Sequence, residues 1–280
     1  MVGTCGFVYV VNTQAYLDEA RASLASLRRH MPGAQVAIIT HEHLFADEPS
    51  VIWIPLTRSY NAPIVKWEAI RCPFDRFVFL DSDTRVLRDI SAMFEPLDAF
   101  DCALAHEPLR GWDYRTTAAR AFCELNTGVM AFRKSDAVVA LFDLWIATYD
   151  RMLGEQKLIA DQPSFREALW SSPQVRLCTL PSEFHLVTGK PAFIAWDAHI
   201  LHGRNNLEAI EGVINQVLGS RVLMPVYGLL TPYCGGRSLL GAWARLTQHV
   251  VRQLVAPKYT ATASAPGDWE LRANAVKKSD

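Results

Sequence analysis

Short apolar runs and amphipathic segments alternate along the first part of the chain. An apolar run at residues 6–11 is followed by a segment in which Leu17, Ala20, Leu24 and Leu27 recur at helical spacing. Two further apolar runs, at 35–40 and 51–55, predict a second and a third strand. Such an alternation of strands and helices is typical of an α/β fold with a mostly parallel sheet.

One apolar run ends directly in acidic residues. Residues 77–80 contain no polar break, which predicts a strand buried on both faces, and Asp81, Ser82 and Asp83 follow them. Ligands of open α/β sheets bind outside the carboxyl ends of the strands, although Asp and Ser after a strand are also common turn formers. Two neighbouring carboxylates repel each other unless a cation lies between them. Because hard oxygen ligands suit Mg²⁺ or Mn²⁺, a divalent metal is the first hypothesis.

Other polar residues stand at the ends of predicted elements. Lys66 lies on a predicted helix at 63–71, where a solvated surface charge is the ordinary interpretation. Asn126 begins a predicted strand at 125–132, and an ordinary turn would also place it there. Asp161 and Gln162 open a later helix, and Asp161 also suits the role of an N-cap.

Two histidines lie near the end of a later apolar stretch. His199 is flanked by apolar residues, and His202 precedes Gly203. A lone histidine is more often structural than a ligand, but a strand end before glycine suits a metal ligand. The sequence leaves the choice between His199 and His202 open.

Composition excludes several functions. The chain has 280 residues, 50% of them hydrophobic, with 28 basic and 29 acidic side chains, which argues against a general nucleic-acid binder. No glycine-rich dinucleotide or P-loop motif follows the first strand. With no basic leader, no apolar run near the roughly 18 residues that cross a bilayer, and six scattered cysteines, we expect a cytoplasmic protein with reduced thiols.

The C-terminal part has a different pattern. Residues 237–258 predict an amphipathic basic helix that packs on the domain, self-associates into a homo-oligomer or lies on an anionic membrane surface. The residues from about 260 onward predict a flexible tail. We therefore expect a catalytic domain at 1–206 and a helical C-terminal extension at 207–280.

The order and spacing of these segments resemble glycosyltransferases of the GT-A fold, most of all the glycogenin-like and galactosyltransferase-like enzymes of glycosyltransferase family 8. The resemblance runs from about residue 6 to residue 206. It is carried by the segments Asn12 to Tyr16, Lys66, Asp81-Ser82-Asp83, Asn126-Thr127-Gly128, Asp161-Gln162 and His202-Gly203. It implies a Rossmann-like, mixed but mostly parallel sheet flanked by helices. It also implies metal-dependent transfer of a sugar from a nucleotide-diphosphate sugar, a UDP-sugar, with retention of anomeric configuration.

The resemblance also implies roles for individual residues. Asp81, Asp83 and His202 would hold Mn²⁺ or Mg²⁺ on the donor diphosphate. The residues that it assigns to the nucleotide and its phosphates are Asn12, Tyr16, Lys66, Asp81 and Ser82. Those that it assigns to the sugar side are Asn126, Asp161 and Gln162, of which Asp161 and Gln162 are the catalytic candidates, as sugar-positioning residues.

The chain departs from the family pattern after the histidine. Family members continue with Gly-x-x-Lys-Pro-Trp, whereas this chain has Gly203, Arg204 and two asparagines, so the usual phosphate-binding lysine is missing. Arg204 is a candidate substitute. The spacing of histidine to glycine also differs, which keeps His199 in competition with His202.

Two other functions fit parts of the sequence. A haloacid dehalogenase-type phosphatase would use Asp81 as its nucleophile, but its motif normally opens the fold and needs a later acidic pair. A non-catalytic nucleotide-sugar binding protein is the other alternative, which the acidic residues at 81, 83 and 161 disfavour.

For a transferase, the acceptor is a carbohydrate, a lipid-linked sugar or a protein, and the segment 107–124 is expected to border it. A lipid-linked acceptor would agree with peripheral membrane contact through the C-terminal helix.

Overall fold

The computed structural model describes residues 3–46, 48, 50–57, 65–107, 114–204, 207–216, 219–224 and 229–232. The chain divides into two compact units. The first takes the chain up to Val187 together with Asp197–His202, and the second takes Thr188–Trp196 and the described residues from Gly203 onward. The basic helix expected at 237–258 and the tail after it lie outside the described residues. The domain boundary expected at 206 stays a prediction.

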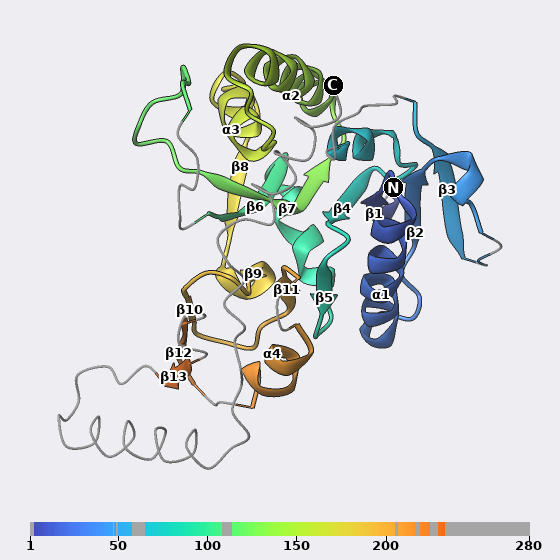
Figure 1. The fold of residues 1–280 in the computed structure, drawn as a ribbon, viewed down its shortest axis with the longest axis vertical. Coiled ribbons are helices and arrows are strands. Elements are labelled where there is room, and N and C mark those ends of the chain that lie inside the picture. The colour runs from blue at the N-terminus through green and yellow to red at the C-terminus, as the bar shows by residue number, and fades with distance from the viewer. Residues whose placement is uncertain are drawn as a thin grey trace, which may run out of the picture. The chain divides into compact units, whose positions relative to one another are not determined.

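A seven-stranded sheet forms the centre of the first unit (Figure 1). Its strands are, in order across the sheet, β3 (Val51–Pro55), β2 (Val36–Thr40), β1 (Cys5–Val10), β4 (Arg76–Leu80), β7 (Leu125–Arg133), β6 (Cys102–His106) and β8 (Leu177–Leu180). Both pairs that β7 makes are antiparallel, and the other four pairs are parallel. The predicted α/β class with a mixed, mostly parallel sheet is confirmed.

Helices cover both faces of this sheet because alternate residues of its strands point to opposite sides. In β4, Phe77 and Phe79 join a core with α2 (Asp136–Gln156) and α3 (Gln162–Trp170). Val78 and Leu80 join a second core with α1 (Gln14–His30). All four side chains are fully buried, so the prediction of a strand buried on both faces is confirmed.

The helices begin where the sequence provides caps. Thr13 accepts a hydrogen bond from the backbone N–H of Tyr16 at the start of α1, and Ser135 accepts one from Val138 at the start of α2. Aromatic rings then fix α3 against α2, since the rings of Trp145 and Phe165 meet edge to face with centroids 4.9 Å apart. Such a pair contributes about 0.5–1.5 kcal/mol beyond its burial. The start of α3 therefore rests on a rigid support.

The remaining elements are short. A small sheet of the first unit contains β5 (Thr84–Val86), β11 (Ile200–His202) and β9 (Leu186–Val187). The second unit contains α4 (Leu207–Ile214) and a sheet of β10 (Ala192–Ile194), β12 (Arg221–Met224) and β13 (Leu229–Pro232). The 3₁₀ helices are η1 (Glu42–Leu44), η2 (Lys66–Arg71), η3 (Ser91–Asp98) and η4 (Ser182–Phe184). Thus the helix expected at 63–71 is a 3₁₀ helix that begins at Lys66, and residues 58–64 lie outside the description.

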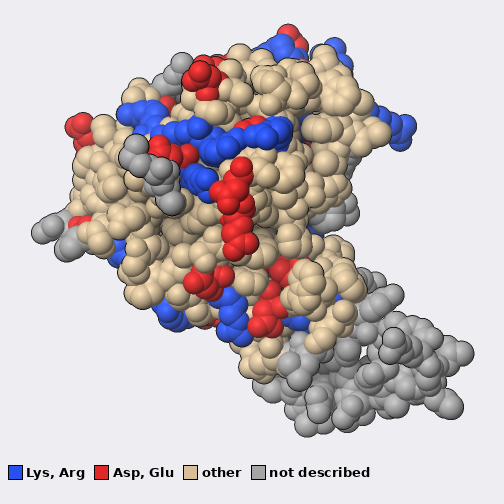
Figure 2. All heavy atoms as spheres, turned by 180° about the vertical axis from the view of Figure 1, so that it is seen from behind, with Lys and Arg blue, Asp and Glu red and all other residues tan. Residues whose placement is uncertain are grey.

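The surface carries both signs of charge. On the face turned away from the view of Figure 1, basic side chains form a band that lies next to acidic ones (Figure 2). No described helix is both long enough and apolar enough to cross a membrane. The five cysteines within the described residues are free thiols.

Candidate metal centre

The turn that follows β4 is closed by backbone hydrogen bonds. The N–H of Asp81 donates to the carbonyl of Gly128 at 2.8 Å, which joins the end of β4 to the start of β7. The carbonyl of Asp81 accepts from both the backbone N–H (3.2 Å) and the hydroxyl (2.8 Å) of Thr84. Because its backbone groups are satisfied in this way, the turn holds two carboxylates at the carboxyl end of the central strand.

Helix α1 anchors the same turn through polar side chains. Ser82 donates to Glu19 at 2.9 Å, and the hydroxyls of Ser23 and Thr84 lie 2.7 Å apart in the buried interior. The hydroxyl of Ser23 also meets that of Tyr9 at 3.0 Å. The Ser82 hydroxyl is therefore directed to α1 and helps to hold the turn in place. Its expected contact with the donor stays a prediction.

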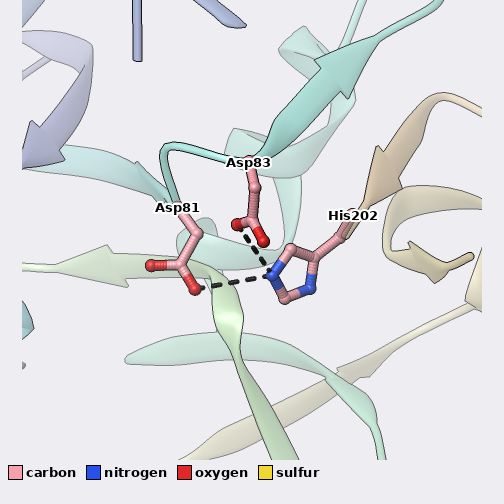
Figure 3. A group of neighbouring side chains, drawn as sticks. All are labelled: Asp81, Asp83 and His202. Atoms are coloured by element: carbon pink, nitrogen blue, oxygen red, sulfur yellow. Dashed lines mark ion pairs between the residues drawn. The ribbon is translucent and has the colours of Figure 1, made fainter. Parts of the chain in front are cut away.

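His202 reaches the turn from the small sheet. Strand β11 pairs antiparallel with β5, and this register sets His202 opposite Thr84. Its Nε2 lies 3.5 Å from a carboxylate oxygen of Asp81 and 3.3 Å from one of Asp83 (Figure 3). Ligand atoms of the three side chains all lie within 4.8 Å of one another, and between 12% and 20% of each side chain remains exposed. The cluster is thus shielded but open to a small ion.

The other histidine takes no part in this cluster. The Nδ1 of His199 lies 2.9 Å from the carbonyl of Asp89, and its ring stacks on Phe184 with centroids 4.4 Å apart. Of the two histidines that the sequence left open, only His202 lies with Asp81 and Asp83.

Gly128 makes room for the His202 ring. A Cβ at this position would lie 2.2 Å from Cε1 of His202, far below any van der Waals separation. The glycine is therefore needed for close packing at the strand start, and not for an unusual backbone angle. Asn126 supports the same segment, because its Oδ1 accepts from the N–H of Gly128 at 2.9 Å and its Nδ2 donates to the buried Glu107 at 2.8 Å. Its amide thus makes two hydrogen bonds within the protein, and its expected contact with the sugar stays a prediction.

Protonation of His202 follows from its carboxylate partners. Burial alone lowers the pKa of His202, but hydrogen bonds to Asp81 and Asp83 and their negative charges outweigh it and raise the pKa to about 9. A proton on Nε2 thus serves as the cation between the carboxylates at neutral pH. A divalent ion would replace that proton with a larger charge, and two carboxylates with one imidazole are a donor set that suits Mn²⁺.

Lys66 joins this cluster to the start of α3. Its Nζ lies 2.8 Å from Asp81 and 3.4 Å from Asp161, and only 16% of its side chain is exposed. Burial lowers its pKa, but the charges of Asp161 and Asp81 outweigh burial and hold the pKa above the ordinary value. Lys66 is therefore a largely shielded, permanent cation, and the interpretation as a solvated surface charge is wrong.

Asp161 occupies the N-cap position of α3 without capping it. Its side chain makes no capping hydrogen bond, and instead accepts from the hydroxyl of Thr127 at 2.9 Å. Its backbone carbonyl accepts from Trp145 and Ser164, which hold the helix start. The carboxylate is thus directed toward Lys66. The next residue, Gln162, is 4% exposed and its Nε2 has no hydrogen-bond partner within the described part of the chain.

The remaining candidates lie at the end of a neighbouring strand. Asn12 follows β1, and Tyr16 lies in the first turn of α1. Because β1 runs parallel to β4, its carboxyl end is at the same edge of the sheet as Asp81. Arg204 is exposed and belongs to the second unit.

Sequence reasoning missed three participants. Thr127 lies inside the Asn126-Thr127-Gly128 segment that carried the resemblance, so that segment was a signal that could have identified its hydroxyl. Glu107 and His185 follow a strand and a short helix without any local motif. Only the tertiary structure reveals the pairing of Glu107 with Asn126 and of His185 with His202.

Comparison with solved structures supports the fold. An active-site mutant of the galactosyltransferase LgtC matches with a TM-score of 0.50 and 10% identity, over 71% of this chain and 88% of that one. Apo-form glycosyltransferase GlyE of Streptococcus pneumoniae TIGR4 matches with a TM-score of 0.51 and 16% identity, over 71% of this chain and 54% of that one. Searches against protein-family models and curated protein sequences gave no match. At these identities the similarity shows that the chain has the GT-A fold.

Proposed function

We propose that this protein is a metal-dependent glycosyltransferase, similar to those of family 8, that transfers a sugar from a UDP-sugar with retention of configuration. The observation that carries the proposal is the convergence of Asp81, Asp83 and His202 at the carboxyl end of the central strand. A fold alone does not determine function, so the proposal depends on this cluster and on the shielded cation beside it.

Asp81, Asp83 and His202 would hold the metal, Mn²⁺ or Mg²⁺. When bound, the ion would supply positive charge to the phosphates of the donor as the bond to the sugar breaks. The chain's part is to keep the three ligands in place. The closed turn, its anchors on α1 and the strand pairing of His202 do this before any ligand arrives.

Lys66 supplies a second, permanent positive charge. Departure of the nucleotide leaves negative charge on phosphate oxygens, and a cation fixed nearby stabilises that charge without needing to reorganise. The position of Lys66 beside Asp81 suits this role, and it reduces the need for the family lysine that the chain lacks after His202. A leaving group stabilised in this way needs no proton.

Asp161 and Gln162 are assigned to the sugar side. Gln162 has a buried amide donor that no described protein group uses, which is what a group that contacts substrate hydroxyls would have. Asp161 is held by Thr127 and Lys66, so it acts here as a sugar-positioning residue. We assign Asn126 to the support of Gly128, and Asn12 and Tyr16 to the uracil and ribose.

Thermal unfolding in the presence of nucleotides tests the proposal. The panel contains UDP, GDP, ADP and their sugars, each with and without Mn²⁺, because a ligand that binds the native state raises the midpoint by mass action. We expect a Mn²⁺-dependent increase with UDP-sugars that Asp83→Asn abolishes. Asp143→Asn, which changes an exposed acid on α2, is the matched control and should behave as the wild type.

Four results would contradict parts of the proposal. Equal shifts with and without Mn²⁺ would contradict the metal dependence. Stronger shifts with GDP- or ADP-sugars would mean that the donor is not a UDP-sugar. Hydrolysis of a generic phosphate ester that requires Asp81, without any nucleotide shift, would favour the phosphatase. Binding of a UDP-sugar without slow hydrolysis or transfer of the sugar would favour a non-catalytic binding protein.

A further inference from the structure

His202 makes a contact on the ring edge that faces away from the two aspartates. Its Nδ1 lies 2.9 Å from Nε2 of His185, and the two ring centroids are 4.9 Å apart. His185 is 4% exposed. The pair therefore lies in the interior, where a hydrogen bond is stronger and its loss is more harmful than at the surface.

The backbone holds this contact in a fixed register. His185 follows η4 directly and precedes β9, and β9 pairs parallel with β11 so that Val187 lies opposite His202. On the other side, β11 pairs with β5, next to Asp83. The His202 ring thus lies between two elements of the first unit, one with the aspartates and one with His185.

We propose that His185 is a positioning residue for the metal centre: by accepting a hydrogen bond from Nδ1 of His202, it directs Nε2 of that ring toward Asp81 and Asp83, so that Nε2 is the nitrogen that would bind the metal. This inference rests on the proposed function, because it assumes that His202 binds the metal.

The chemistry of imidazole leads to this assignment. A neutral ring carries one proton, and a ring that coordinates a metal through Nε2 must carry that proton on Nδ1. The proton at Nδ1 then needs an acceptor, and Nε2 of His185 lies at hydrogen-bond distance from it. Outer partners of this kind fix the tautomer and orientation of a ligand histidine and increase its basicity.

A purely structural role makes a different prediction. If His185 only fills space in the interior, any side chain of similar size that folds should leave metal affinity unchanged. Phe keeps the size and removes the acceptor, whereas Gln places an oxygen acceptor close to the position of Nε2. Comparison of His185→Phe with His185→Gln therefore separates hydrogen bonding from packing.

Isothermal titration of the full-length protein with Mn²⁺ alone is the test. We expect His185→Phe to weaken Mn²⁺ binding by about 10- to 100-fold and His185→Gln to recover most of that loss. His199→Phe is the matched control, because its imidazole contacts the carbonyl of Asp89 away from the cluster, and its affinity should equal that of the wild type. Circular dichroism of each metal-free variant verifies that it is folded.

A spectroscopic measurement adds a direct readout. Long-range ¹H–¹⁵N spectra of the Mg²⁺-loaded protein should assign His202 to the Nδ1–H tautomer in the wild type and in His185→Gln. A folded His185→Phe variant with wild-type Mn²⁺ affinity, or a His202 ring protonated at Nε2 in the Mg²⁺-loaded wild type, would overturn the inference. Failure of the proposed function has a different signature, because then the wild type and Asp83→Asn would bind Mn²⁺ equally weakly.

Discussion

The proton on His202 and a divalent metal compete for the same nitrogen. With a pKa of about 9, roughly 1 in 100 molecules has a neutral His202 at pH 7, and roughly 1 in 10 at pH 8. Metal ligands must be deprotonated, so this population limits the apparent affinity. Lowering the pH from 8 to 7 should therefore weaken Mn²⁺ binding about tenfold, which corresponds to about 1.4 kcal/mol.

Calorimetric titration with Mn²⁺ at pH 7.0, 7.5 and 8.0 measures this slope. Repeating each titration in two buffers of different ionisation enthalpy counts the protons, and we expect close to one proton released per ion bound at pH 7. His202→Gln should bind more weakly but with a flat pH profile, because the titrating imidazole is no longer present. Affinity that is independent of pH in the wild type, without proton release, would refute the reasoning.

The same proton has an effect in the metal-free protein. The pKa of His202 is raised above its unfolded value of 6.5, so its protonation adds to the free energy of unfolding. This contribution is fully present below pH 6.5 and is lost as the pH rises toward 9. The shift corresponds to roughly 3 kcal/mol. Urea unfolding should therefore show the wild type losing stability over this interval relative to His202→Gln, and saturating Mn²⁺ should restore the difference at the upper end.

Three further substitutions, one of them with a matched control, test the surroundings of the cluster. Lys66→Met leaves the buried Asp161 carboxylate without its cation and removes one of the two cations beside Asp81, so we expect a loss of about 3–5 kcal/mol in urea unfolding. A loss below 1 kcal/mol would contradict the ion pair of Asp161 with Lys66. Gly128→Ala places a methyl group in the volume of the His202 imidazole and should reduce Mn²⁺ affinity more than tenfold. The matched control is Gly154→Ala on the exposed side of α2, where a Cβ meets nothing within 4 Å, and it should stabilise the helix by up to about 1 kcal/mol. Thr127→Val removes the hydroxyl that donates to Asp161 while keeping its shape, so unfolding should show a loss of about 1–3 kcal/mol, and an unchanged stability would mean that this hydrogen bond contributes nothing.

Local patterns were enough to predict most strands of the large sheet, although they did not identify β8. The uninterrupted run from Phe77 to Leu80 can only be buried on both sides, and the acids after it mark the edge at which ligands bind. Predicted strands at 6–11, 35–40 and 51–55 correspond to β1, β2 and β3 within one or two residues. Each of these strands is a short run of apolar residues that are adjacent in the sequence, which is why the sequence pattern alone identifies it.

Long-range contacts account for what the sequence left open. His199 and His202 differ little in local sequence, and only the pairing of β11 with β5 decides which ring meets the aspartates. The direction of a polar side chain in a motif is equally hard to predict from sequence. Asn126 and Ser82 form hydrogen bonds with other protein side chains. Asp161 makes no capping hydrogen bond and instead pairs with Lys66. A side chain's direction depends on the packing of segments far apart in sequence, which no local pattern encodes.

The pairing of β5 with β11 determines when the candidate metal centre can form during folding. The two strands are separated by 113 residues (87–199), and closing a flexible chain of that length opposes folding with an entropic term of about 4 kcal/mol. On the ribosome, β1, α1 and β4 are complete long before His202 has been synthesised, so both aspartates must wait for the last ligand. A bound ion would stabilise this contact between segments far apart in sequence. Binding of the metal would therefore coincide with the last step in the folding of the first unit.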